Sequence, residues 1–268
     1  MGKVAFVFPG QGSQVVGMGK AVHDAVPAAR AVFEAADGAL GESLSQLCFE
    51  GPMEQLKLTA NTQPALLTTA IALLRALDEK PDAVAGHSLG EYAANVAAGA
   101  ISFERAVRLV RLRGTFMQEA VPVGEGAMAA VLGGDPAAIE EALRAVPGVV
   151  EPVNYNSPGQ IVIAGQASAV DAAKPALVAL GCKVMPIPVS APFHSSLMQP
   201  AEERLRPHLS DTPFENPEVP VYVNVDAAPV SEGALLREAL VRQVSRPVRW
   251  LYWYDGTWYE ENPMTLGT

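Results

Sequence analysis

Cysteine is scarce in this sequence: its 268 residues include only Cys48 and Cys182. The two lie far apart, and neither has a second thiol or a histidine at the spacing of metal ligands. A disulfide framework or a zinc centre needs several such residues at short intervals. We therefore expect two reduced cysteines that pack in the core, and no metal site.

Long apolar runs and a surplus of basic residues are missing as well. No stretch approaches the roughly 18 unbroken apolar residues of a membrane span, and residues 1–8 lead directly into a predicted strand, unlike a signal peptide. We expect a cytoplasmic protein with no membrane partner. The net charge of -10, from 19 basic and 29 acidic residues, argues against nucleic acid, because phosphate binding needs a basic surface.

Hydrophobic residues make up 49% of the chain, which is enough for a large buried core. The first part of the chain alternates short strands that are apolar throughout, residues 4–8 and 83–85, with alanine-rich helices. Strands without polar alternation are covered on both faces, as in parallel α/β sheets. The pattern predicts an α/β fold with a hydrolase-like, parallel-sheet body, and it returns around residues 220–224.

Between these parts the order of the predicted elements changes to β-α-β-β-α-β, which is typical of the split βαβ, ferredoxin-like unit. Strands are expected at 127–132, 149–154, 160–164 and 183–189, and helices at 135–146 and 168–180. We predict a body of residues 1–125 plus 193–268 and an inserted ferredoxin-like subdomain of residues 126–192. A cleft is expected between the two.

A serine stands on the sequence Gly86-His87-Ser88-Leu89-Gly90, directly after an apolar strand. This G-x-S-x-G pattern is typical of a sharp strand-to-helix turn that exposes the serine hydroxyl. The N–H of the next residue, Leu89, is then free to stabilise an oxyanion. Ser88 is a candidate acyl nucleophile. The alternative is a glycine-rich turn before a helix, with no catalytic role.

A serine nucleophile needs a base, and the chain has four histidines. His87 sits on the turn itself, where in-line approach to the neighbouring hydroxyl is difficult. His23 and His208 lie in polar, helix-like surroundings, so we interpret them as surface imidazoles. His194 lies where the inserted unit returns to the body, and we assign it as the base. No acidic residue flanks it, which predicts a dyad whose imidazole is held by a backbone carbonyl or an amide.

Arg113 belongs to a predicted helix over residues 103–119. At about 100° per residue it falls in the middle of the apolar face of this helix. A guanidinium on a buried face is costly unless it is paired, and its planar fork suits a carboxylate. Arg113 is therefore either a clamp for a substrate carboxylate or half of a structural ion pair with Glu91 or Glu119. The opposite, solvated face of the helix is expected to carry Arg105, Arg108 and Arg111.

The first strand ends in a glycine-rich loop, residues 8–14, at the end of the sheet where α/β proteins bind ligands. Its Gly-x-Gly lacks the third glycine and the later acidic residue of a dinucleotide fingerprint. We therefore expect no nicotinamide and no other cofactor. The glycines let the backbone approach a reacting centre, with the Gln11 N–H as the second oxyanion donor.

These segments, in this order and spacing, resemble the malonyl-CoA:acyl carrier protein transacylase family of bacterial type II fatty acid synthesis. The similarity extends over about residues 3–250. It is carried by six motifs, namely residues 8–14, 62–65, 86–92, 113–114, 154–160 and 193–195.

The resemblance implies ping-pong acyl transfer through a malonyl ester of Ser88, with His194 as the base and no bound cofactor. It implies that Arg113 holds the malonyl carboxylate, that Gln11 and Leu89 are the oxyanion donors, and that the carbonyl of Gln243 orients the histidine. To the substrate pocket we further assign Gln63, His87, Met117 and Phe193. Phe193, bulky and next to the base, is expected to disfavour a branched methylmalonyl group.

The partners that the resemblance implies are malonyl-CoA and an acyl carrier protein, and we expect a monomer. Carrier proteins of this kind are acidic, so basic residues are needed near the cleft despite the net negative charge. The candidates are Lys174, Lys183, Arg204 and Arg206.

Two other functions fit part of the pattern. A serine hydrolase acting on thioesters or esters would use the same serine and base, although Arg113 on an apolar face and the missing acid favour transfer. A catalytically silent carrier-binding module is suggested only by the end of the chain.

After Trp250 the sequence departs from the helix, closing strand, Gly-Pro-Gly-like turn and final helix that the resemblance implies. Instead, aromatic runs flank Asp255-Gly256, which is a hairpin signal. Residues 258–263 alternatively form a degenerate closing strand. We expect segment 251–259 to cover the exposed edge of the first strand.

Overall fold

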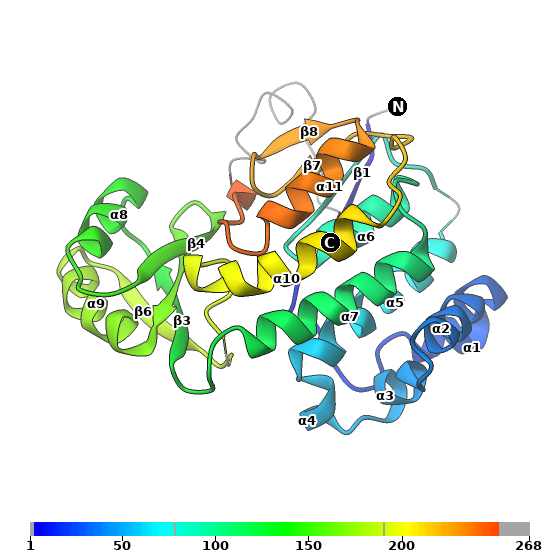
Figure 1. Ribbon diagram of the computed structural model, residues 1–268, viewed down its shortest axis with the longest axis horizontal. Coiled ribbons are helices and arrows are strands. Elements are labelled where there is room, and N and C mark those ends of the chain that lie inside the picture. Colours follow the sequence, from blue (N-terminus) through cyan, green and yellow to red (C-terminus); the bar gives the residue numbers. More distant parts are fainter. Residues whose placement is uncertain (1–2, 78, 190, 252–268) are drawn as a thin grey trace.

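The computed structural model of the chain describes residues 3–77, 79–189 and 191–251. Two four-stranded sheets organise it, and helices surround both (Figure 1). The expected hairpin of residues 251–259, the alternative closing strand of residues 258–263 and the covering of the first strand lie outside the described residues, apart from Leu251.

The first sheet has the order β1-β2-β7-β8, and β2 (Ala83–Gly86) lies in its middle. β1 (Ala5–Phe8) and β7 (Val221–Val223) both run parallel to β2, and β2 is buried along its whole length. This confirms the predicted α/β fold with a parallel sheet. The sheet also has an antiparallel edge, because β8 (Ala228–Val230) forms a hairpin with β7.

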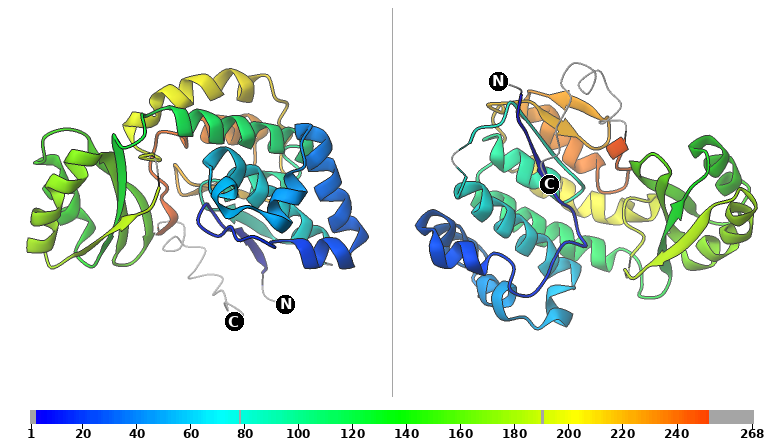
Figure 2. Two further views of the ribbon diagram at one scale, coloured as in Figure 1. Left: turned by 90° about the horizontal axis from the view of Figure 1, so that it is seen from below. Right: turned by 180° about the vertical axis from the view of Figure 1, so that it is seen from behind.

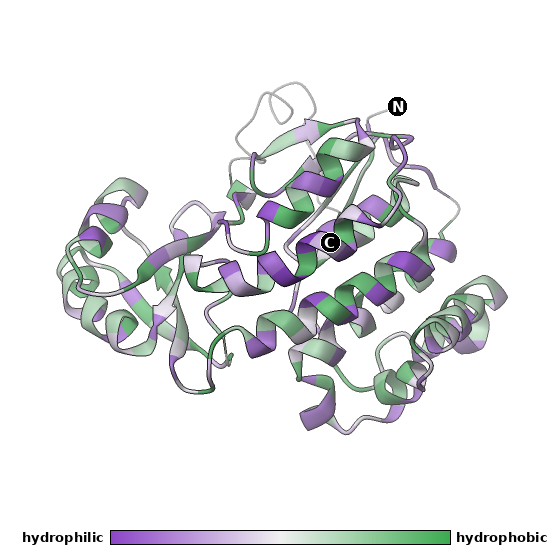
Figure 3. Ribbon diagram, in the orientation of Figure 1, coloured by the Kyte–Doolittle hydropathy of each residue, from purple (hydrophilic) through white to green (hydrophobic). Residues whose placement is uncertain are grey.

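Helices cover this sheet and form the rest of the body. α6 (Gly90–Ala97) packs on β1 and β2, while α5 (Thr59–Arg75), α7 (Phe103–Glu119) and α10 (Gln199–Ser210) run side by side across the body (Figure 1). Hydrophilic and hydrophobic residues alternate along α7 and α10, as expected for helices with one face in the core (Figure 3). The remaining body helices are α1 (Lys20–Ala25), α2 (Pro27–Leu40), α3 (Leu44–Glu50), α4 (Met53–Leu56), α11 (Gly233–Arg242) and the 3-10 turn Ser196–Met198.

The second sheet has the order β4-β5-β3-β6, and all of its pairs are antiparallel. Together with two helices this is the predicted β-α-β-β-α-β order, and it lies to one side of the body (Figure 2). The elements end within about three residues of the expected positions. They are β3 (Gly126–Leu132), α8 (Pro136–Arg144), β4 (Val150–Ser157), β5 (Gln160–Gln166), α9 (Ala167–Ala179) and β6 (Lys183–Ile187).

The two faces of the second sheet pack against different parts of the chain. Side chains such as Val131 and Ile163 join a core with α8 and α9, whereas Met128 and Val162 join the hydrophobic core of the body. This alternation is the period of two expected for strands with both faces buried. The predicted division into residues 1–125 plus 193–268 and 126–192 stays a prediction.

A short segment after α11 ties the second sheet to the body. The Tyr155 N–H donates to the carbonyl of Val248 at 2.9 Å, and the Val248 N–H donates to the carbonyl of Val153 at 2.8 Å. In this bridge Asn154 of β4 pairs with Val248, which follows Gln243 by only a few residues along the chain. Gln243 itself caps the end of α11. The second sheet is therefore hydrogen-bonded to the chain segment that carries a predicted site residue.

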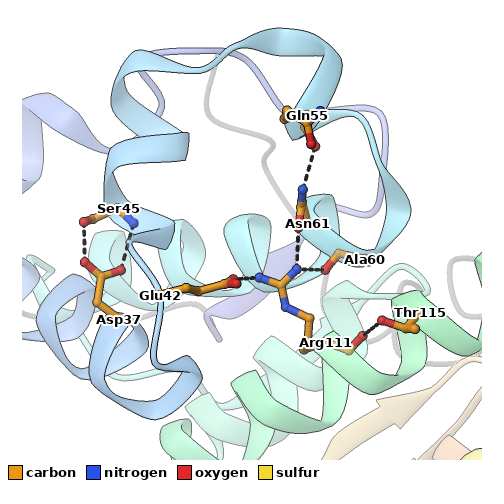
Figure 4. Close-up of polar contacts among 8 residues, drawn as sticks. All are labelled: Asp37, Glu42, Ser45, Gln55, Ala60, Asn61, Arg111 and Thr115. Atoms are coloured by element: carbon orange, nitrogen blue, oxygen red, sulfur yellow. Dashed lines mark hydrogen bonds and ion pairs between the residues drawn. The ribbon is translucent and has the colours of Figure 1, made fainter.

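Arg111 corrects the predicted solvated face of α7. Its side chain is only 20% exposed, and it donates to the Ala60 carbonyl and to Asn61 Oδ1 while pairing with Glu42 (Figure 4). The interpretation was wrong because helical periodicity describes one helix and does not see the neighbours that cover its polar side. Arg105 and Arg108 are exposed, as expected.

Both cysteines are free and buried, which confirms their predicted role in packing. Burial raises the pKa of the Cys48 thiol to about 12. Among the helices of the described residues, none combines the length and the apolar character that crossing a bilayer requires.

The turn between β2 and α6 is closely packed. A Cβ on Gly86 would lie 1.9 Å from the carbonyl carbon of Gly90, and a Cβ on Gly90 would lie 2.2 Å from the carbonyl oxygen of Phe8. Ser88, between them, has a left-handed φ of 52°. The strand-turn-helix geometry expected from the sequence is present, and it requires glycine on both sides of the serine.

This packing predicts that Gly90→Ala loses more than about 2 kcal/mol of unfolding free energy, because its methyl group would collide with the backbone of Phe8. Urea unfolding followed by circular dichroism measures the loss. Gly38→Ala is the matched control, since a Cβ there, within α2, meets no atom within 4 Å. It should gain about 0.5–1 kcal/mol, and equal stability of the two variants would contradict the close packing.

Candidate active site

Ser88 and His194 meet just beyond the carboxyl end of β2. Ser88 Oγ lies 2.7 Å from His194 Nε2, and His194 Nδ1 lies 2.8 Å from the backbone carbonyl oxygen of Gln243. Because a carbonyl can only accept, Nδ1 carries the proton and Nε2 is left to accept the hydrogen of the serine hydroxyl. The pair therefore has the arrangement of a nucleophile and its base, held by a carbonyl in place of a carboxylate.

The imidazole of His194 is kept neutral by its surroundings. It is only 4% exposed, and burial, followed by the charge of Arg113, lowers its pKa to about 3. The hydrogen bond to Gln243 opposes this shift. A neutral imidazole at neutral pH is the form that accepts a proton from a hydroxyl.

Arg113 comes from α7 and is fully buried beside the serine, with only 1% of the residue exposed. Its Nη2 donates to Ser88 Oγ at 3.2 Å and to Gln243 Oε1 at 2.8 Å, and its Nη1 donates to Gln63 Oε1 at 2.9 Å. The guanidinium lies over the ring of Tyr92, 5.6 Å from its centre. Its Nε is buried and has no partner among the described residues.

Neither of the alternative ion pairs is formed. Among the salt bridges of the described residues Arg113 has none, and Glu119 pairs instead with Arg204 at 2.8 Å. Glu91 is separated from Arg113 by the side chain of Gln243, which bonds to both. A buried cation without a contacting carboxylate has donor capacity that a ligand carboxylate can use.

Gln243 holds the site together through its side chain as well as its backbone. Its Nε2 donates to the Ser88 carbonyl at 2.9 Å and to Glu91 Oε2 at 2.8 Å, while its Oε1 accepts from Arg113. From the sequence, only the carbonyl of this residue was predicted to have a role. The side-chain bonds were missed because they join positions more than 100 residues apart along the chain.

Asn224 is a site residue that sequence reasoning missed altogether. It follows β7, its Oδ1 accepts from the Ser88 N–H at 2.6 Å, and its Nδ2 donates to the Gly86 carbonyl at 2.7 Å. Its backbone N–H donates to Glu91. The available signal was its place at the end of a buried strand in a parallel sheet, where side chains of neighbouring strands converge.

The loop after β1 lies against the serine turn. A Cβ on Gly10 would come within 2.8 Å of the His87 carbonyl oxygen, so the backbones are in close contact. No hydrogen bond among the described residues uses the N–H of Gln11 or of Leu89. The Gln11 side chain reaches Thr59 at 3.4 Å.

The other assigned pocket residues divide into two groups. Gln63 contacts Arg113 and also Met117 Sδ, at 3.8 Å, and both Met117 and Phe193 are buried. His87 faces the second sheet instead, with its Nε2 2.9 Å from Asn156 Oδ1 and its ring against Trp250. Burial lowers the pKa of His87.

The two remaining histidines lie in the body. His208 is exposed, as expected, and stacks on Phe116. His23 is half-buried, between Phe33 and Phe49, so its interpretation as a solvated imidazole was wrong. The aromatic partners come from α2 and α3 and were not visible in the local sequence.

Most of the basic carrier-docking candidates form ion pairs within the chain. Lys174 pairs with Asp171, Arg204 with Glu119, and Arg206 with Glu202. Lys183 is exposed at the start of β6. Their role toward a carrier protein stays a prediction.

The chain was compared with known families and proteins. The acyl transferase domain family matches residues 5–252. The malonyl CoA-acyl carrier protein transacylase of Bacillus subtilis (strain 168) is 51% identical over 256 residues, which cover 93% of this chain and 81% of that protein. The protein of that name from Escherichia coli (strain K12) is 51% identical over 257 residues, covering 93% and 83%.

Solved structures agree with these relatives. The malonyl CoA-acyl carrier protein transacylase of Coxiella burnetii superposes with a TM-score of 0.93 at 47% identity, covering 97% of this chain and 84% of that one. A malonyl-transacylase in complex with its type II PKS acyl-carrier protein superposes with a TM-score of 0.89 at 46% identity, covering 92% and 82%. This chain therefore belongs to the acyl transferase domain family and, within it, to the malonyl CoA-acyl carrier protein transacylases.

Proposed function

We propose that this acyltransferase moves a malonyl group from malonyl-CoA to the phosphopantetheine thiol of an acyl carrier protein, through a malonyl ester of Ser88. One observation carries the proposal: Ser88 Oγ lies within hydrogen-bond distance of both His194 Nε2, at 2.7 Å, and Arg113 Nη2, at 3.2 Å. A nucleophile, a base and a cation that no carboxylate contacts thus converge on one point. The names of the similar proteins give the same reaction.

The reaction has two matching halves. Ser88 Oγ attacks the thioester carbonyl while His194 Nε2 takes the hydroxyl proton, and the C–S bond breaks as the ester forms. The imidazolium then returns its proton to the departing CoA sulfur. In the second half the carrier thiol gives its proton to His194, attacks the ester carbonyl and leaves Ser88 Oγ to be reprotonated.

The negative charge on the carbonyl oxygen needs donors at each tetrahedral stage. We assign this role to the N–H groups of Gln11 and Leu89. Two observations support this assignment. Neither N–H donates a hydrogen bond to another described residue, and the loop after β1 is in backbone contact with the serine turn. Donors that are already oriented stabilise the oxyanion without reorganisation.

Arg113 selects acyl groups that carry a carboxylate. Among the described residues, the fully buried guanidinium of Arg113 has no carboxylate in direct contact. The carboxylate of a bound malonyl group supplies this missing anionic partner. It also offsets the charge that depresses the pKa of His194, so the base becomes stronger when the matching substrate is bound. Gln63 orients the guanidinium, and Met117 and Phe193 complete the acyl pocket.

The remaining assignments belong to the same proposal. The bulk of Phe193 disfavours methylmalonyl, and residues 126–192 form one wall of the cleft. The enzyme works as a cytoplasmic monomer without a cofactor, and basic residues near the cleft receive the acidic carrier protein. A hydrolase would share Ser88 and His194, but the similar proteins are named as transacylases.

Mixing with malonyl-CoA should add one malonyl group to the chain, and Ser88→Ala should abolish the adduct because its oxygen nucleophile is gone. Intact mass spectrometry measures both results. Addition of an acyl carrier protein should then remove the group from the enzyme and place it on the carrier. An adduct that persists on Ser88→Ala would refute the assignment of the nucleophile.

Arg113→Ala should lower kcat/KM for malonyl transfer by about a hundredfold or more, because a desolvated charge pair with the substrate is lost. Transfer of acetyl should improve relative to malonyl, since the buried cation that disfavours neutral acyl groups is gone. Arg105→Ala, an exposed arginine of the same helix, is the control and should leave both rates unchanged. An equal loss for malonyl and acetyl would indicate a structural role.

The rate at which a neutral fluorophosphonate labels Ser88 should stay constant between about pH 5.5 and 7.5. The pKa of His194 is lowered to about 3, so the imidazole is already neutral throughout this range and loses no base function as the pH falls. Time courses of labelling at each pH measure the rate. A half-maximal rate near the ordinary histidine pKa of about 6.5 would contradict the predicted environment.

A further inference from the structure

Glu91 is a fully buried carboxylate on the first turn of α6, with 0% of the residue exposed. Its Oε2 accepts from the Asn224 N–H at 2.9 Å and from Gln243 Nε2 at 2.8 Å. Its Oε1 is buried and has no partner among the described residues. A carboxylate in such a place is costly to ionise unless a positive charge lies nearby.

The nearby positive charge is Arg113, and one amide group separates the two. Gln243 Nε2 donates to Glu91 while Gln243 Oε1 accepts from Arg113 Nη2, so the side chain of Gln243 is a spacer between carboxylate and guanidinium. Each charge favours the ionised form of the other. The site thus holds two buried, opposite charges that do not touch.

The spacing has a consequence for a ligand of Arg113. A direct ion pair would occupy the guanidinium fork, and a missing counter-charge would leave a buried cation uncompensated. With the carboxylate one amide away, the fork stays open, but any second anion placed on it is repelled by Glu91. In a water-poor interior such a repulsion is felt beyond contact distance.

We infer that Glu91 is a specificity-determining residue: its charge, held one amide away from Arg113, weakens the attraction of Arg113 for an acyl carboxylate. The inference rests on the proposed malonyl transfer. An acyl group that the enzyme must receive and then give away cannot be held too tightly, because binding that is equally strong before and after transfer slows release. Glu91 thus lowers the preference for malonyl over acetyl while it keeps the malonyl ester transferable.

The charge of Glu91 changes close to neutral pH. Burial raises the pKa of the Glu91 carboxyl to about 7, and the nearby charge of Asp226 also raises this pKa. The hydrogen bonds from Asn224 and Gln243 and the charge of Arg113 lower it. Two further groups, Tyr92 and Arg242, also interact electrostatically with Glu91. Above this pKa Glu91 is charged and repels a bound carboxylate, whereas below it Glu91 is neutral and the repulsion is gone. The preference for malonyl should therefore fall as the pH rises through 7.

A competition experiment isolates this effect. The whole chain is mixed with equal amounts of malonyl-CoA and acetyl-CoA between about pH 6 and 8, and the initial rates of malonyl and acetyl addition to Ser88 are compared by intact mass. His194 and the phosphates of CoA act in both reactions, so their titration cancels in the ratio. We expect the malonyl-to-acetyl ratio of the unmodified chain to fall about fivefold or more over this range.

Glu91→Gln keeps the shape and an acceptor oxygen for Asn224 and Gln243 but removes the charge. Its ratio should be independent of pH and at least as high as that of the unmodified chain at pH 6. Glu119→Gln is the matched control, because Glu119 is half-exposed at the far end of α7 and pairs with Arg204. Its ratio should fall with pH as in the unmodified chain.

Two results would overturn the role of Glu91. One is a malonyl-to-acetyl ratio of the unmodified chain that does not change between pH 6 and 8. This result would refute the role of Glu91 even if the Glu91→Gln variant does not fold. The other is a Glu91→Gln ratio that is lower than, or falls in parallel with, that of the unmodified chain. Failure of malonyl to add to Ser88 at all would instead refute the proposed function itself, so the two failures are distinguishable.

Discussion

Burying one guanidinium beside a serine is the constraint on which the rest of this site depends. Arg113 loses its hydration when α7 packs against α5, and the surrounding residues replace it with acceptors and an aromatic face. Gln63 and Gln243 supply amide oxygens, and Glu91 supplies the compensating charge from behind Gln243. Each of these polar groups is buried with the arginine and compensates for its lost hydration. The arrangement still leaves donor capacity on Arg113 for a ligand.

Ser88 and His194 both have backbone conformations that residues other than glycine rarely adopt. Their φ angles are positive, 52° and 64°, at a cost of about 1–3 kcal/mol each. Asn224 stabilises the turn at Ser88 by hydrogen bonds to the backbone of Ser88 and Gly86. The carbonyl of Gln243 accepts a hydrogen bond from the imidazole of His194 and so fixes its orientation. Hydrogen bonds with Gln243, just after α11, and with Asn224, just after β7, thus fix where the Ser88 hydroxyl and the His194 imidazole meet.

The second sheet belongs to the same hydrogen-bonded frame. One of its faces shares the hydrophobic core of the body, and β4 bonds to the segment around Val248 that directly follows Gln243. His87 adds a further link, from the serine turn to Asn156 in β4. Displacement of this sheet would therefore be felt at the Gln243 carbonyl that accepts from His194.

Local patterns in the sequence by themselves determined the main elements and singled out Ser88, His194 and Arg113, which the fold brings together. Apolar strands predicted the parallel sheet, the glycines around Ser88 predicted the turn, and an arginine on an apolar helix face predicted a buried cation. Tertiary structure alone decided what surrounds them. Contacts between distant segments decided whether Arg113 pairs directly with Glu91 and whether Arg111 is solvated. They also brought Asn224 and the side chain of Gln243 into the site. Periodicity and motifs describe one segment at a time, so such contacts appear only when the chain is folded.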